Sequence, residues 1–228
     1  SFFGQLSWNY KHRYLAAATM RADGSTKFAP GNQWGYFPSL SAAWSVTEEP
    51  WMKSVKWLNL LKIRASWGLT GNNRIDNDMW RYLYSVSTSG GPGFGETTPN
   101  GEQYYSFGNG NKFTNEKIKW ETNIKRNLAA DISMFDGRLN ITPEFYWNTT
   151  KDLLYLSDVP TTSGYTTQMR NIGKVSNRGA ELSVNYDILR GSDYVLSANM
   201  TFGYNKFKVD KLNETDNIIW DNNNRWSS

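Results

Sequence analysis

The sequence has 228 residues, a net charge of +4, 39% hydrophobic residues and a mean hydropathy of −0.64. No stretch approaches the roughly 18 continuous apolar residues of a spanning helix, which excludes an α-helical membrane protein but not a β-barrel, whose apolar residues alternate with polar ones. Cysteine is absent and His12 is the single histidine, which excludes disulfides, thiolate or histidine-rich metal sites and leaves little for His-based catalysis. We therefore expect no enzyme, and the absence of a basic run gives no support to nucleic-acid binding.

Apolar and polar residues alternate in eight segments, which predicts eight β-strands. In chain order the first four lie at about 2–10, 13–22, 36–46 and 60–70. The fifth lies between residue 120 and the turn at 136–137, and the sixth between that turn and about residue 152. The last two alternate over about 180–188 and 196–205. A tight turn is expected at Lys11-His12. Thr47-Glu48-Glu49-Pro50-Trp51 is typical of a single helical turn with Thr47 at its N-cap.

The two strands that meet at Asp136-Gly137 are the most informative. Asp-Gly favours a two-residue hairpin turn, because both central positions need positive φ. The alternation on either side runs longer than a dozen residues, whereas ordinary strands have about 5–6 and a tilted strand crossing a bilayer needs about 9–11. The pattern predicts an all-β, antiparallel, up-and-down transmembrane β-barrel. The faces expected to look outward into lipid carry Leu128, Ile132, Ile141, Phe145, Leu182, Val184, Leu196 and Met200.

The connections alternate in length. Short ones are expected at residues 11–12, 47–57, 136–137 and 190–193, and long ones at 23–35, 71–120, 152–177 and 207–228. In an outer-membrane barrel the short turns are periplasmic and the long loops are external. Arg126 is an exception on the predicted lipid face, and we expect it near the outer rim, since a charge at the midplane costs about 2–4 kcal/mol.

Three ordered motifs resemble one family, the SusC/RagA-type TonB-dependent outer-membrane transporters. They are residues 21–28 (RADGSTKF) with 35–39 (GYFPS) and Ala43-Trp44, residues 61–72 (LKIRASWGLTGN), and residues 171–182 (NIGKVSNRGAEL). The resemblance implies a barrel of about 22 strands in the outer membrane of a Gram-negative bacterium. It further implies an N-terminal plug, import of glycans or oligopeptides driven by TonB-ExbB-ExbD, and a SusD-like lipoprotein as a lid. No plug, TonB-contacting segment or closing C-terminal strand is recognised, so we expect an internal barrel segment that does not close by itself.

Within the motifs, Arg21 and Asp23 share a strand face and are expected to form an ion pair, with Gly24 giving turn freedom. Gly173 and Gly179 flank a polar bend. Glu181 is expected to point inward, into a network of ion pairs in the wall, with contact to substrate as the alternative.

The loop 71–120 is rich in aromatic residues, which could stack on sugars or grip a peptide, or instead pack against one another or against the lid protein. The candidates for substrate contact are Trp80, Tyr82, Tyr84, Tyr104 and Tyr105. Asp76 and Asp78 offer the oxygen ligands that Ca²⁺ prefers, but no EF-hand loop is completed, so solvation of the loop is the favoured interpretation and no cofactor is expected.

Two other classes of protein fit parts of the pattern. One is a secreted carbohydrate-binding β-sandwich, whose apolar strand faces would lie between two stacked sheets. The other is a free-standing eight-stranded outer-membrane protein acting as an enzyme or adhesin, in which the first and last strands would pair. The small inward residues of the present chain suit a wide lumen better than one filled by side chains.

Overall fold

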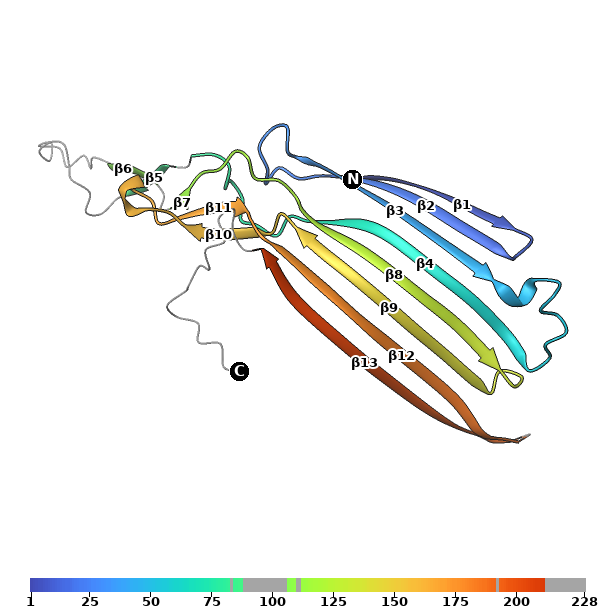
Figure 1. Cartoon of the computed structure of the whole chain (residues 1–228). Coiled ribbons are helices and arrows are strands. Elements are labelled where there is room, and N and C mark those ends of the chain that lie inside the picture. The colour runs from blue at the N-terminus through green and yellow to red at the C-terminus, as the bar shows by residue number, and fades with distance from the viewer. Residues whose placement is uncertain (83, 88–105, 110–111, 192, 212–228) are drawn as a thin grey trace, which may run out of the picture.

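A computed structural model describes residues 1–82, 84–87, 106–109, 112–191 and 193–211. Eight long strands form one antiparallel sheet in the order β1-β2-β3-β4-β8-β9-β12-β13 (Figure 1). Their bounds are β1 Phe2–Tyr10, β2 Tyr14–Gly24, β3 Trp34–Ser45, β4 Leu58–Asn72, β8 Glu121–Met134, β9 Leu139–Lys151, β12 Lys174–Arg190 and β13 Val195–Lys211. No helix in these ranges is long and apolar enough to cross a membrane. The predicted eight strands and their up-and-down order are confirmed.

Backbone hydrogen bonds from each turn to a neighbouring turn or strand end show that the short connections share one end of the sheet. The amide of Ser45 donates to Arg13 O at 2.8 Å, and the amide of Phe135 donates to Trp57 O at 2.9 Å. The amide of Asp187 donates to Arg138 O at 2.8 Å. We call this the turn end and the opposite one the loop end; both are visible in Figure 1. The predicted segregation of short and long connections is therefore confirmed.

The turns follow the predicted chemistry in two places and depart from it in a third. Asp136 and Gly137 have φ of 56° and 78°, and Arg138 N donates to Phe135 O at 3.1 Å. Phe135 also has a positive φ, 56°, and the last strand pair is Met134 with Leu139, so the reversal is wider than the expected two residues. Positive φ also occurs at both Lys11 and His12. After β3, a 3₁₀ turn η1 (Val46–Glu48) replaces the expected capped helical turn, with Ser45 rather than Thr47 at its N-cap. The Thr47 hydroxyl instead accepts a bond from Leu61 N at 3.4 Å, because the incoming strand β4 passes beside it.

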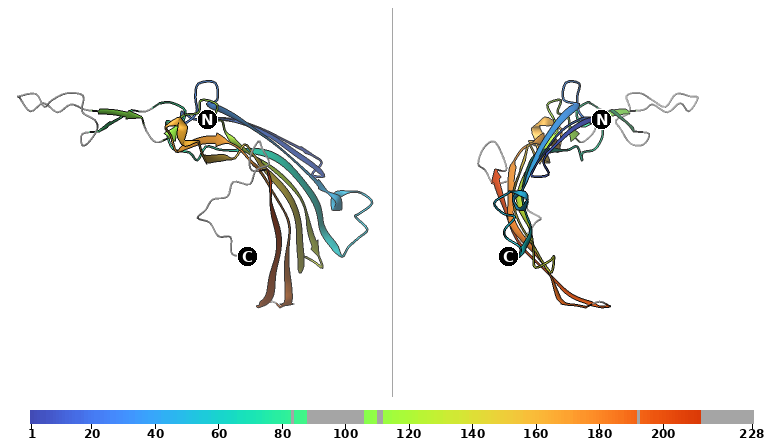
Figure 2. Two further views of the ribbon diagram at one scale, coloured as in Figure 1. Left: turned by 60° about the vertical axis from the view of Figure 1, so that its left-hand side comes forward. Right: turned by 90° about the vertical axis from the view of Figure 1, so that its right-hand side faces the viewer.

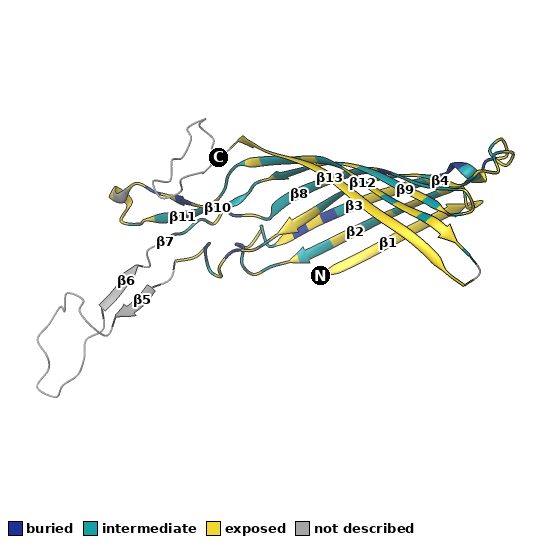
Figure 3. Cartoon of the chain, turned by 90° about the horizontal axis from the view of Figure 1, so that it is seen from below, coloured by how far each residue is buried: buried dark blue, intermediate teal, exposed yellow. Residues whose placement is uncertain are grey.

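The eight-stranded sheet is a single curved layer (Figure 2). Its apolar residues are uncovered: Leu128, Phe145, Leu196 and Met200 are 42–55% exposed, and the long strands are coloured mostly exposed or intermediate in Figure 3. No second sheet lies over this face among the described residues, which rules out the β-sandwich. Strands β1 and β13 are the two edges and do not pair with each other, so the described chain is not a closed eight-stranded barrel.

The long strands extend further into the expected loops than the sequence pattern predicted. Strand β3 begins at Trp34, β4 continues to Asn72, β12 begins at Lys174 and β13 continues to Lys211. The loops also have structure of their own: β5 (Tyr84–Ser87) pairs with β6 (Ser106–Asn109), and β10 (Leu154–Asp158) and β11 (Thr167–Asn171) form a small sheet with β7 (Lys112–Phe113). A 3₁₀ turn η2 (Thr161–Ser163) joins β10 to β11. Loop backbones need hydrogen-bond partners, and these short strands supply them.

Candidate functional site

The polar face of the sheet has a groove near the loop end. It has a volume of about 470 Å³, and its polar lining includes Gln5, Thr19, Arg21, Asp23, Ser39 and Lys125. These side chains come from β1, β2, β3 and β8, and the register places Gln5 opposite Thr19 and Thr19 opposite Ser39. A groove with hydroxyl, amide and charged groups side by side can bind a hydrated, polar molecule through several hydrogen bonds at once.

Arg21 and Asp23, which were expected to pair, lie with Arg21 Nε 2.7 Å from Asp23 Oδ2. Their strand ends one residue later, at Gly24. Gly24 does not have the positive φ expected of it. Its missing side chain serves packing instead, because the indole of the opposing Trp34 lies 3.4 Å from the position that a Cβ would occupy.

Phe37 connects this groove to the loops. Its ring is nearly buried, and a Cβ at either Gly35 or Gly71 would overlap it. The same ring lies edge-on to Trp120, with centroids 5.5 Å apart. The two glycines therefore let an aromatic side chain of the wall reach the loop that precedes β8.

The loops have a small apolar core, which we call the loop cluster. It consists of Phe28, Ile75, Met79 and Ile118, with Trp80, Trp120, Leu154 and Met169 packed against it. Phe28 and Ile118 are fully buried. Polar groups join the same segments: Lys27 Nζ donates to Ile75 O at 2.8 Å, and Trp120 Nε1 donates to Gln33 O at 3.1 Å. Four loop segments distant in sequence are thereby held together above the groove.

The aromatic candidates divide into different environments. Trp80 packs on the loop cluster, donates from Nε1 to Thr26 O at 3.3 Å, and lines a hollow with Ala29, Pro30, Asn32, Glu116 and Lys117. Tyr82 is 56% exposed. Tyr84 begins β5, and Tyr104 and Tyr105 lie outside the described residues. Trp80 is therefore placed where it can both stabilise the loop and contact a ligand.

Asp76 and Asp78 each face a cation rather than each other. Lys112 Nζ lies 2.8 Å from Asp76 Oδ2, and Arg81 Nε lies 2.7 Å from Asp78 Oδ1. The hydrogen bond and charge of Lys112 lower the pKa of Asp76. No cluster of three or more metal-ligating side chains occurs in the described ranges.

The remaining motif residues lie on β12 or just before it. Glu181 stands opposite Glu144 and Gly203, and it forms no ion pair within the described part of the chain, contrary to expectation. An ion pair elsewhere in the wall joins Arg64 of β4 to Asp131 of β8, with Nε 2.8 Å from Oδ2. Gly179 admits the ring of Tyr146, which a Cβ would strike. Gly173 has a positive φ of 92°. The bend expected between Gly173 and Gly179 does not occur, because residues 174–178 are extended in β12 and Gly179 lies within that strand.

Glu49 is a buried residue that the sequence analysis did not single out. Its carboxylate accepts hydrogen bonds from Tyr14 Oη at 2.7 Å and Trp44 Nε1 at 3.1 Å, and Arg13 Nη1 lies 3.5 Å away. These contacts lower the pKa of Glu49, and the hydrogen bond from Tyr14 has the largest effect. Its partners come from β2, β3 and the turn between β1 and β2, so local sequence offered no signal except an acid beside a proline.

A single curved layer of long antiparallel strands, apolar on one face and polar on the other, is the wall of a transmembrane β-barrel. The family described as TonB dependent receptor-like, beta-barrel matches residues 1–227. The chain belongs to that family.

Its relatives and structural neighbours are much longer proteins. It is 36% identical over 216 residues to the TonB-dependent receptor P39 of Formosa agariphila, covering 95% of the chain and 20% of the relative. It is 36% identical over 210 residues to the TonB-dependent receptor SusC of Bacteroides thetaiotaomicron, and this match covers 90% of the chain and 20% of SusC. Among solved structures, the RagAB peptide importer in its closed-closed state superposes with a TM-score of 0.81 at 25% identity. The superposition covers 92% of the present chain and 22% of the matched RagAB chain. The chain therefore spans about a fifth of the length of these curated relatives.

Proposed function

We propose that the chain is part of the wall of an outer-membrane importer that takes up glycans or oligopeptides with energy from TonB. In this proposal the loop end is external, and the loops contact substrate or a SusD-like lipoprotein lid. The TonB-ExbB-ExbD system would act through another part of the protein. Membership of the TonB-dependent receptor family and the likeness to SusC and to the RagAB peptide importer support this assignment.

The observation that carries the proposal is the polar groove beneath the loop cluster. Phe37 lines that groove and also touches Trp120 of the loops, so cargo leaving the loops would meet the groove next. Glycans and oligopeptides are both rich in hydrogen-bonding groups, which Thr19, Ser39 and Lys125 can satisfy. The wall would thus hold polar cargo weakly at several points, which suits transport better than tight binding at one point.

The test is uptake by cells that produce the full-length protein. Labelled oligosaccharides and labelled oligopeptides are offered separately, and uptake is measured with TonB present and absent. Lys125→Glu reverses the charge of the groove, and Lys56→Glu makes the same change in the exposed turn before β4. We expect TonB-dependent uptake of one substrate class, reduced by Lys125→Glu and unaffected by Lys56→Glu.

Uptake that continues without TonB would contradict the energy source in this proposal. Equal uptake by the Lys125→Glu and Lys56→Glu proteins would show that the groove does not contact cargo. Binding of neither substrate class by the purified full-length protein would remove the importer assignment while leaving the barrel fold intact.

A further inference from the structure

The apolar face of the sheet carries a second groove, on the opposite side from the polar one. Its volume is about 590 Å³. Alanines from three neighbouring strands form its floor: Ala16 and Ala18 of β2, Ala42 of β3 and Ala65 of β4. Large side chains surround that floor, namely Leu6, Trp8, Leu40, Trp67, Leu128 and Trp147. The register places Ala16 opposite Ala42 and Ala42 opposite Ala65, so the hollow follows from a row of small residues between rows of large ones.

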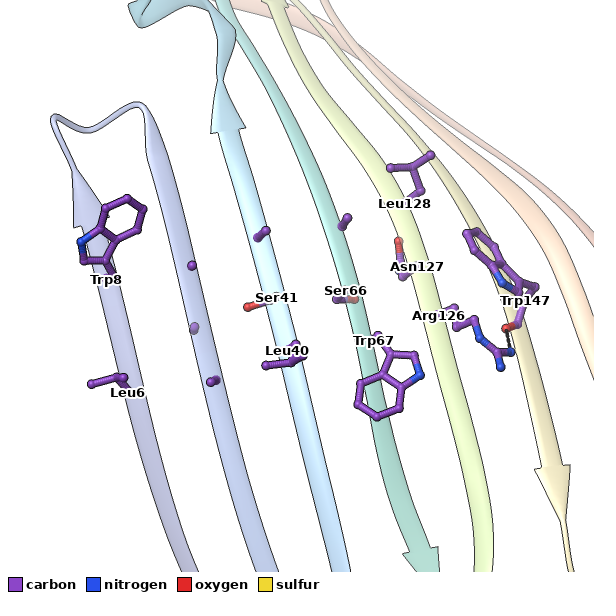
Figure 4. Close-up of a pocket in the computed structure, with 15 residues that line it drawn as sticks. Leu6, Trp8, Leu40, Ser41, Ser66, Trp67, Arg126, Asn127, Leu128 and Trp147 are labelled. Carbon is purple, nitrogen blue, oxygen red and sulfur yellow. Dashed lines mark hydrogen bonds between the residues drawn. The ribbon is translucent and has the colours of Figure 1, made fainter.

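Arg126 borders this groove. Its Nη1 donates to Trp147 O at 3.5 Å (Figure 4), and Trp67 stands directly opposite it on β4. A cation between two indoles on a lipid-facing surface is typical of the membrane–water boundary, where amphipathic rings collect. Arg126 forms no ion pair with a carboxylate in the described part of the chain, so its charge is available to a ligand.

The same cross-strand row continues with two more cations. Trp147 stands opposite Arg178 on β12, and Arg178 opposite Lys206 on β13. Neighbouring strands are about 5 Å apart, so the three cations span about 15 Å. On the other side of Arg126 the row is apolar, with Trp67 followed by Leu40, Ala18 and Leu6. The nearby Asp210 is already occupied by Ser176 and Lys208.

The depth of this row in the membrane follows from β12. Arg178 and Arg190 lie twelve residues apart on that strand. Between them Ala180, Leu182, Val184 and Tyr186 alternate on the apolar face, up to a register shift between Asp187 and Leu189. At about 3.3 Å per residue and a tilt of about 40°, twelve residues cover about 30 Å along the membrane normal. That equals the thickness of the hydrocarbon core. Arg178 therefore lies at the lipid headgroups of the leaflet on the loop end. Because the strands are tilted by about 40°, the row from Arg126 to Lys206 changes depth by about 9 Å. The long side chains of arginine and lysine can bridge that difference by extending toward the headgroups.

We propose that Arg126, Arg178 and Lys206 bind the phosphate-bearing headgroup of an outer-leaflet lipid, with one of its acyl chains in the alanine-floored groove. A phosphate accepts charge-assisted hydrogen bonds from guanidinium and ammonium groups. An acyl chain that lies in the adjacent groove is in van der Waals contact with the apolar side chains on its floor and sides, which attracts it more strongly than the looser contacts between lipid chains. The inference rests on the loop end being external, as in the proposed function, but not on the nature of the cargo.

The experiment uses the full-length protein in detergent and native mass spectrometry with lipid A carrying a single phosphate as the probe. The triple variant Arg126→Gln/Arg178→Gln/Lys206→Gln is compared with Lys11→Gln/Lys53→Gln/Lys56→Gln, which removes three exposed positive charges at the turn end. We expect the first variant to bind the lipid on the order of 100-fold more weakly, since a basic residue contributes about fivefold at an anionic surface. The turn-end variant should bind as the wild type does.

A second variant tests the groove. Ala65→Phe fills the floor without changing charge, and it should weaken binding of the lipid but not that of inorganic phosphate. Circular dichroism verifies that each variant is folded. Equal losses of lipid binding in both triple variants would show that only the net charge of the protein matters, and this would overturn the proposal. Unchanged lipid binding with a change in the mass of the oligomer would show that a second copy covers this face, and would also overturn it. Loss of substrate uptake with lipid binding intact would count against the proposed function alone.

Discussion

The two ends of the sheet are stabilised in different ways. At the turn end, adjacent strands reverse through a few residues, and neighbouring turns are joined by backbone hydrogen bonds and by the hydrogen-bonded carboxylate of Glu49. At the loop end, side chains from four segments bury Phe28 and Ile118 completely. Local polar contacts thus suffice where chain reversal is short, while long connections need an apolar core to offset the entropy of ordering them.

The largest effect is expected from Phe28→Ala. Removal of a fully buried ring leaves a cavity, and such substitutions cost about 3–5 kcal/mol. We expect faster hydrogen exchange of residues 73–82 and 112–120 in the full-length protein, with the strands of the sheet unchanged. Phe135→Ala, in an exposed turn position, is the control and should leave exchange as it is. Faster exchange throughout the sheet would show that the loop cluster is not a separate unit.

A smaller effect is expected where the wall meets the loops. Gly71→Ala would place a methyl group on the Phe37 ring, and such overpacking costs about 1–3 kcal/mol. Gly4→Ala is the matched strand variant, because nothing lies within 4 Å of its added Cβ. Unfolding in denaturant measures both. Adding Phe37→Leu to Gly71→Ala should restore part of the lost free energy of unfolding. If it does not, the Phe37 ring is not the cause of that loss.

The turn end should show a dependence on pH. The folded-state pKa of Glu49 is lowered by Tyr14, Trp44 and Arg13, so the ionised carboxylate adds stability above its unfolded pKa of about 4.3. That contribution is lost as the pH falls through the lower, folded value. Unfolding measured from pH 6 to pH 3, conditions chosen to bracket about 4.3, should show a smaller loss of stability in Glu49→Gln than in the wild type. Glu48→Gln, exposed and adjacent, should follow the wild type.

The smallest effect is expected at the ion pair of Asp76 and Lys112, in which the Asp76 side chain is 72% exposed. Exposed pairs contribute little and are screened by salt. Asp76→Asn should change hydrogen exchange near Lys112 slightly at low ionic strength and not at all at high ionic strength. A large change that persists at high ionic strength would mean that Asp76 has another partner in the full-length protein.

The sequence by itself determined the eight strands, their order and the segregation of their connections. Alternation with a period of two, as in the segments around Leu128 and Phe145, is a local property, and so is the turn chemistry of Asp136-Gly137. Once the strands and turns are given, an up-and-down meander brings alternate connections to the same end. The strand limits at Trp34 and Lys211 were missed, since pairing with a neighbouring strand can extend a strand through residues whose own pattern is weak.

Only the tertiary structure decided which distant residues meet. The contacts of Phe37 with Gly71 and Trp120, of Glu49 with Tyr14, and of Phe28 with Ile118 join segments that share no local pattern. The row of Arg126, Arg178 and Lys206 emerges only when the register of β8, β9, β12 and β13 is known. A shift of one residue in any of these pairings would turn a strand's side chains to the other face, which is why the register, and not the composition, places the sites.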